Sequence, residues 1–105
     1  MAAKTYAGKT VEVNEEGFLV NPDEWTEDMA PALAETVGIY ELTDMHWKVI
    51  RFMRSDFAER DQAPSVRRIK NVGGVPTKEL YRLFPNGPAK KAALISGLGK
   101  PQGCV

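Results

Sequence analysis

A chain of 105 residues is long enough for one hydrophobic core and too short for two domains that each have their own. Hydrophobic residues make up 43% of it and charged residues 27%, which is too apolar for a disordered chain. Fourteen basic side chains offset fourteen acidic ones, so net charge gives no general attraction to nucleic acid or to an anionic membrane. We expect one folded domain whose contact with nucleic acid is at most weak.

The chain has no apolar run as long as a bilayer span, and its first eight residues lack the apolar stretch of a signal peptide. We therefore expect no membrane contact and a cytoplasmic location. The single cysteine, Cys104, excludes a disulfide within the chain. Together with the single histidine, His46, it provides too few ligands for a structural zinc site. We expect no metal and no cofactor, and any thiol chemistry must join Cys104 to a partner.

The N-terminal part predicts a β-hairpin followed by a helix. β-Branched residues alternate with other residues on both sides of the turn-forming stretch Asn14-Glu15-Glu16-Gly17, which predicts a hairpin over residues 6–20. Thr26 precedes two acidic residues, a pattern typical of a helix start, and Gly38 is typical of a helix end. These signals predict a helix that ends at about residue 37.

The longest helix is expected from Asp44 to about Arg60, with Thr43 as its N-cap. Its apolar stripe contains Trp47, Ile50, Arg54 and Phe57, and is widened by neighbouring residues. Turns that contain glycine or proline then separate three shorter helices, expected over residues 66–72, 78–84 and 89–96. The fold class is therefore α+β and mainly helical, with a small N-terminal β-hairpin or meander packed on a bundle of about five helices.

The last nine residues are too rich in glycine and proline to continue a helix or to form a central strand. We expect one compact domain over residues 1–96 and a mobile arm over residues 97–105. A lone cysteine is usually a buried packing residue. The position of Cys104 near the end of such an arm favours instead an accessible, reactive thiol.

Several stretches resemble one protein family. Residues 81–92 and 95–105 resemble the C-terminal signature of the DsrC/TusE family of sulfur-carrier proteins. Residues 16–19, Trp25 and the segment 46–54 resemble the same family, so the likeness covers nearly the whole chain. It implies a sulfurtransferase that accepts sulfur as a persulfide on its penultimate cysteine, here Cys104, and passes it to a partner protein.

The resemblance also implies partners and a pathway class. The sulfur donor would be a DsrEFH-like or TusBCD-like protein, and the acceptor a sulfite reductase or a tRNA-thiolating enzyme. DsrC proper has a second cysteine upstream on its arm, and the resemblance places Ala93 at that position here. This departure favours a persulfide relay of the TusE kind, or a single-cysteine DsrC-like paralogue, over a cycle that needs two thiols. Three cations are candidates for stabilising the persulfide or docking partners: Arg82, Lys90 and Lys100.

A second hypothesis assigns the chain another role. It would be an accessory or regulatory subunit, like the gamma subunit of sulfite reductase or a DNA-binding protein, with Cys104 as a redox sensor. Two successive short helices, the first with a basic face over residues 66–72, resemble a helix-turn-helix, although the balanced net charge opposes strong DNA binding. We interpret His46 as a structural or helix-capping residue, and the aromatic residues as core: Trp25, Trp47, Phe52 and Phe57.

Overall fold

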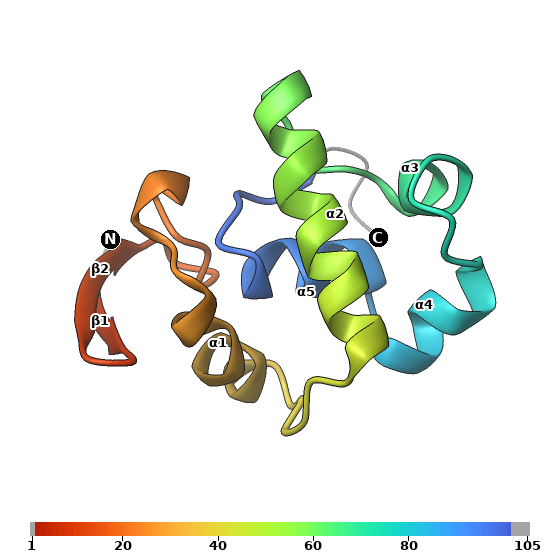
Figure 1. Ribbon diagram of the computed structural model, residues 1–105. Coiled ribbons are helices and arrows are strands. Elements are labelled where there is room, and N and C mark those ends of the chain that lie inside the picture. Colours follow the sequence, from red (N-terminus) through yellow and green to blue (C-terminus); the bar gives the residue numbers. More distant parts are fainter. Residues whose placement is uncertain (1, 102–105) are drawn as a thin grey trace.

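The computed structural model describes residues 2–101 (Figure 1). Two antiparallel strands come first, β1 (Ala2–Tyr6) and β2 (Lys9–Val13). Two short 3₁₀ turns and five α-helices follow in the described part of the chain. Their bounds are η1 Pro22–Glu24, η2 Glu27–Met29, α1 Ala30–Thr36, α2 Asp44–Arg60, α3 Val66–Asn71, α4 Thr77–Leu83 and α5 Pro88–Ile95. The predicted α+β class with a mainly helical body is confirmed.

The hairpin turns earlier than the sequence suggested. The strands pair with Tyr6 opposite Lys9, so their connection is the two-residue turn Ala7-Gly8. Both residues have positive φ, 51° and 80°, as a type I′ hairpin turn requires. Alanine rarely adopts positive φ, so this dipeptide gave little signal of a turn. The first strand also begins at residue 2, whereas the hairpin was expected from residue 6.

The turn predicted at residues 14–17 is present, but it extends the hairpin into a small meander. The Asn14 side chain accepts hydrogen bonds from the backbone N–H groups of Glu16 and Phe18, at 2.9 and 3.1 Å. The chain then returns to form a single antiparallel bridge between Val13 and Leu19. This turn carries Glu16 at the surface, where it meets Lys100 in the segment that follows α5.

Helix α2 begins and ends at the predicted residues. The Thr43 hydroxyl accepts from the His46 backbone N–H, and the His46 ring accepts from the Thr43 backbone N–H, which makes a reciprocal capping box. Asp61 ends the helix in the left-handed conformation, with φ 58°. The cap expected from Thr26 is absent, because its side chain makes no capping hydrogen bond to η2.

Helix α5 is the most deeply buried element. It packs against α1, α2 and α4, and Figure 1 shows it behind α2 in the middle of the molecule. Only Lys90 and Lys91 are partly exposed along it, while its alanines let the neighbouring helices approach closely. The hydrophobic core therefore forms around the helix that directly precedes the C-terminal segment.

The body of the protein continues past residue 96. Gly97, with φ 73°, ends α5 in a Schellman motif, in which the Leu98 N–H donates to the Ala93 carbonyl at 2.9 Å and the Gly97 N–H to the Leu94 carbonyl at 3.2 Å. Leu98 is 0% exposed and belongs to the core. The boundary predicted between residues 96 and 97 therefore does not coincide with the end of packing. Residues 102–105, the rest of the predicted arm, lie outside the described residues.

A buried ion pair ties α2 to α3. The Asp56 side chain is 3% exposed and accepts three hydrogen-bond contacts of 2.8–3.0 Å from Arg68. Arg60 lies 3.9 Å from the same carboxylate. The pair fixes the position of α3 on the end of α2, since an isolated carboxylate at this depth would be strongly destabilising.

Asp56→Asn is expected to lower the free energy of unfolding by about 2–4 kcal/mol, because one of the two acceptor oxygens becomes an NH2 group that faces guanidinium donors and the opposite charge is lost. Urea denaturation measures the loss. Glu59→Gln is the matched control, because Glu59 is exposed and acts on Arg68 only through charge. Equal, small losses for both variants would contradict a structural role for this pair.

Candidate functional site

Two of the predicted cations meet at one carboxylate. Lys90 on α5 and Lys100 beyond it place their Nζ atoms 3.5 and 3.3 Å from Oε1 of Glu16. These contacts lower the pKa of Glu16, and the hydrogen bond from Lys100 is the largest cause. The Glu16 side chain is 45% exposed, so the cluster is a surface network. It brings the N-terminal turn, α5 and the start of the C-terminal segment together.

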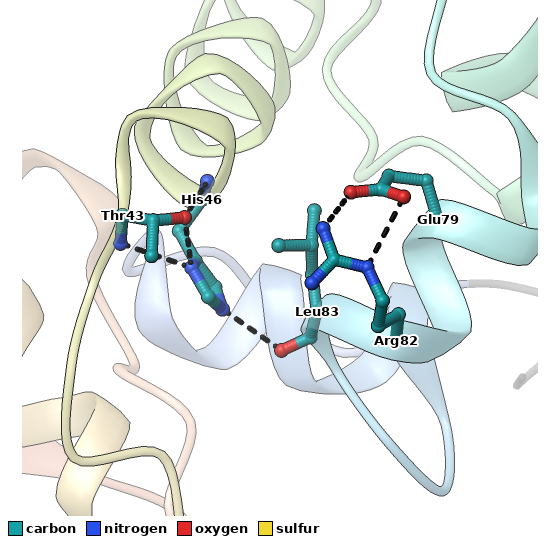
Figure 2. A network of polar contacts seen from close by, with 5 residues as sticks. All are labelled: Thr43, His46, Glu79, Arg82 and Leu83. Atoms are coloured by element: carbon teal, nitrogen blue, oxygen red, sulfur yellow. Dashed lines mark hydrogen bonds and ion pairs between the residues drawn. The ribbon is translucent and has the colours of Figure 1, made fainter.

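Arg82 lies in a separate contact on α4. Its guanidinium pairs with Glu79 one turn earlier, with Nε 3.2 Å from Oε2 and Nη2 bonded to Oε1 (Figure 2). The hydrogen bonds raise the pKa of Arg82 and lower the pKa of Glu79. The Arg82 side chain is 68% exposed and thus open to a partner. Cys104, the fourth predicted site residue, lies outside the described residues.

His46 holds α2 to the end of α4. Figure 2 shows its ring between Thr43 and Leu83. Its Nε2 lies 2.9 Å from the Leu83 carbonyl, and its Nδ1 accepts from the Thr43 N–H at 3.0 Å. A carbonyl can only accept, so Nε2 carries the hydrogen and both ring nitrogens are occupied. The interpretation of His46 as a structural, helix-capping residue is confirmed.

The residues that hold the end of α5 were not recognised as a site from the sequence. Trp25 Nε1 donates to the Ile95 carbonyl at 2.9 Å, and Arg54 Nη1 donates to the Ser96 carbonyl at 3.1 Å. The Arg54 guanidinium lies over the Trp25 ring, 4.7 Å from its centroid, and also donates to the Pro22 carbonyl. Burial lowers the pKa of Arg54, opposed by the charge of Asp23. The available signal was an arginine within the apolar stripe of the longest helix.

A pocket of about 250 Å³ lies between the C-terminal end of α2 and residues 99–100. Residues at the end of α2, in the loop after it and in the segment after α5 border the pocket: Phe57, Asp61, Gln62, Ala63, Gly99 and Lys100. Among residues 2–101, no three histidine, cysteine, aspartate or glutamate side chains are grouped to hold a metal ion. None of the helices in this range is both long enough and apolar enough to cross a lipid bilayer.

Comparison with known proteins decides the family. Residues 5–105 match the sequence profile described as DsrC like protein. The chain belongs to this DsrC-like family. The gamma subunit of dissimilatory-type sulfite reductase from Nitratidesulfovibrio vulgaris is 41% identical over 105 residues, which is 100% of both chains. The sulfurtransferase TusE of Yersinia pseudotuberculosis serotype I is 39% identical over 107 residues, covering 95% of this chain and 98% of TusE.

The three-dimensional comparison agrees with the sequences. A crystal structure of dissimilatory sulfite reductase I contains a chain that superposes with a TM-score of 0.87 at 37% identity, over 99% of this chain and 100% of that chain. The resemblance to DsrC/TusE sulfur-carrier proteins, stated from the sequence, is thus confirmed. The DsrC-like match includes the last residues of the chain, and so includes Cys104.

Proposed function

We propose that this DsrC-like protein is a sulfur-relay carrier that holds sulfur as a persulfide on Cys104 and transfers it to a partner protein. The observation that carries the proposal is the family match over residues 5–105, which includes the chain's only cysteine. The relative named sulfurtransferase TusE supports transfer of sulfur as the activity. The protein acts as a carrier and needs no turnover chemistry of its own.

The proposed loading step is a thiol exchange without net oxidation. The Cys104 thiolate attacks the terminal sulfur of the donor's persulfide. The donor's S–S bond breaks, the donor leaves as a thiolate, and Cys104–S–SH forms. In the second step the acceptor's thiolate attacks the same terminal sulfur, and Cys104 leaves as a thiolate. One sulfur atom moves in each step, and the electrons balance.

The cations have supporting roles in this proposal. Lys100 precedes Cys104 by four residues in the sequence, and Lys90 and Lys100 both contact Glu16. We propose that these two lysines supply positive charge near the anionic persulfide. Arg82 is exposed on α4 and serves partner docking. The proposed donor is a DsrEFH-like or TusBCD-like protein, and the proposed acceptor a sulfite reductase or a tRNA-thiolating enzyme. No membrane takes part, and contact with nucleic acid is at most weak.

Ala93 favours a single-thiol relay. It stands where DsrC proper has a second cysteine, and here its side chain is fully buried while its carbonyl accepts from Leu98. With one cysteine in the chain, no internal disulfide or trisulfide can form. We therefore propose a relay of the TusE kind rather than a cycle that stores sulfur between two thiols of the same chain.

Intact-mass measurement tests the proposal. The reduced protein is incubated with inorganic polysulfide and, separately, with a persulfide-loaded sulfurtransferase. We expect a gain of one sulfur atom that a reductant removes and that prior alkylation of the thiol prevents. A protein that gains no sulfur from either donor is not a persulfide carrier.

The match to a sulfite reductase gamma subunit favours a second candidate, an accessory subunit whose cysteine senses redox state. In that role the protein binds its partner enzyme whether or not the thiol is intact, and oxidation of Cys104 changes the affinity. Binding of purified sulfite reductase to the reduced, oxidised and alkylated protein separates the two roles. Binding that responds to oxidation, in a protein that gains no sulfur, supports the sensor.

A further inference from the structure

Helix α2 carries two arginines that each lie over a tryptophan ring, and only one of these pairs touches the end of α5. Arg51 lies 5.3 Å from the Trp47 ring centroid, is 65% exposed and pairs with Glu27. Arg54 lies 4.7 Å from the Trp25 ring centroid, and both Arg54 and Trp25 are partly buried. We call Arg54 and Trp25 the inner pair, and Arg51 and Trp47 the outer pair. The two pairs share chemistry and helix, and they differ in what else they contact.

The inner pair binds two consecutive carbonyls at the end of α5. In a continuing helix the carbonyls of Ile95 and Ser96 would accept from residues farther along, but Gly97 turns the chain away. Trp25 Nε1 and Arg54 Nη1 replace those donors, at 2.9 and 3.1 Å. A guanidinium at this place also complements the negative end of the helix dipole.

The Trp25 ring also fixes the turn itself. A Cβ atom added to Gly97 would lie only 2.3 Å from Cδ1 of Trp25, so the ring packs directly against the glycine backbone. Three successive residues, 95, 96 and 97, are therefore held by one pair of side chains. Because Leu98 and Pro101 are buried as well, the path of the chain is fixed up to residue 101.

Three peptide bonds separate Pro101 from Cys104, and three residues span at most about 10 Å. The direction of the chain at residue 101 therefore decides which part of a partner the thiol can reach. We propose that Arg54 and Trp25 are positioning residues for sulfur transfer, which aim the C-terminal segment at the partner's acceptor. This inference rests on the proposed carrier function and adds the residues that direct it.

The test compares each inner residue with its outer counterpart in the full-length protein. Arg54→Met and Trp25→Phe remove the donors to the α5 carbonyls, and Arg51→Met and Trp47→Phe are the matched controls. Each variant is loaded with polysulfide, and transfer is followed to a protein acceptor and to cyanide. We expect the inner variants to lose between about tenfold and a hundredfold in kcat/KM with the protein, and to react normally with cyanide. We expect Arg54→Lys, which keeps one donor, to recover part of the loss.

A direct measurement separates this inference from the carrier function. A nitroxide on Cys104, the only cysteine, broadens the amide resonances of the surface near it. We expect a confined set of broadened amides in the unchanged protein and in Arg51→Met, and a dispersed set in Arg54→Met and Trp25→Phe. Unchanged broadening in both inner variants overturns the positioning role, as does equal slowing toward protein and cyanide. Failure of the unchanged protein to gain sulfur overturns the carrier function, while the broadening pattern still reports whether Arg54 and Trp25 direct the C-terminal segment.

Discussion

Replacing Cys104 with serine is expected to abolish sulfur loading completely. A serine hydroxyl is not ionised at neutral pH and forms no persulfide, so neither polysulfide nor a protein donor should add sulfur to the variant. We expect the melting temperature to stay almost unchanged, because residues next to a chain end contribute few buried contacts. Intact mass and thermal unfolding measure the two effects.

The combination of outcomes matters more than the loss of loading. A variant that loads no sulfur and unfolds at the normal temperature places the chemistry on the thiol. A large drop in melting temperature would mean that the thiol is a packing residue, which would contradict the carrier proposal. Sulfur gained by the serine variant would mean that another nucleophile in the chain is responsible.

Gly97→Ala is expected to lower the free energy of unfolding by about 2–5 kcal/mol. The positive φ of 73° costs an alanine about 1–2 kcal/mol, and overpacking in a filled core adds about 1–3 kcal/mol. The clash is with the Trp25 side chain at 2.3–2.5 Å, and that ring is held by its own hydrogen bond to Ile95. Urea denaturation at neutral pH measures the loss.

Gly99→Ala is the control, two residues farther on. A Cβ at Gly99 meets no atom within 4 Å, and its φ is not in the left-handed region, so we expect a change within about 0.5 kcal/mol. Comparable losses at both positions would show that glycine content, rather than the contact with Trp25, determines stability here. The comparison also tests whether the two glycines serve the same purpose.

The sequence predicted regular elements well where local signals agree. In α2 the Thr43 cap, the apolar stripe and the charged ends all indicate the same helix, and its bounds are confirmed. The hairpin turn was misplaced because Ala7 adopts a φ of 51° that its side chain disfavours, while residues 14–17 carry the stronger turn signal. Pairing between strands, and not local preference, decides such a turn.

The C-terminal segment shows a second limit. Local sequence does not distinguish a glycine that ends a helix in a Schellman motif from a glycine in a mobile linker. The prediction of a mobile arm therefore includes Gly97 and Leu98, although both make Schellman hydrogen bonds to α5. Burial of Leu98 depends on contacts with distant residues, which local sequence does not report. For the site, the position of Cys104 and the family resemblance both predict that its thiol is the reactive group.

The partners of Lys100 and Arg54 could not be predicted from the sequence, because they lie far away along the chain. Lys100 and Glu16 are 84 residues apart, and nothing in either segment indicates that they meet. Arg54 lies in the predicted apolar stripe of α2, yet its partners at Pro22 and Ser96 come from two other parts of the chain. Arg82, by contrast, pairs within its own helix, three residues from Glu79.

The junction at the end of α5 has a consequence for folding kinetics. Its hydrogen bonds join residues separated by 70 positions, Trp25 and Ile95, and by 42 positions, Arg54 and Ser96. Contacts of such high sequence separation carry a large loop-closure entropy and form after local helices. We therefore expect the helices to form before the hydrogen bonds at the end of α5, so that the positioning proposed for Arg54 and Trp25 is complete only in the fully folded molecule.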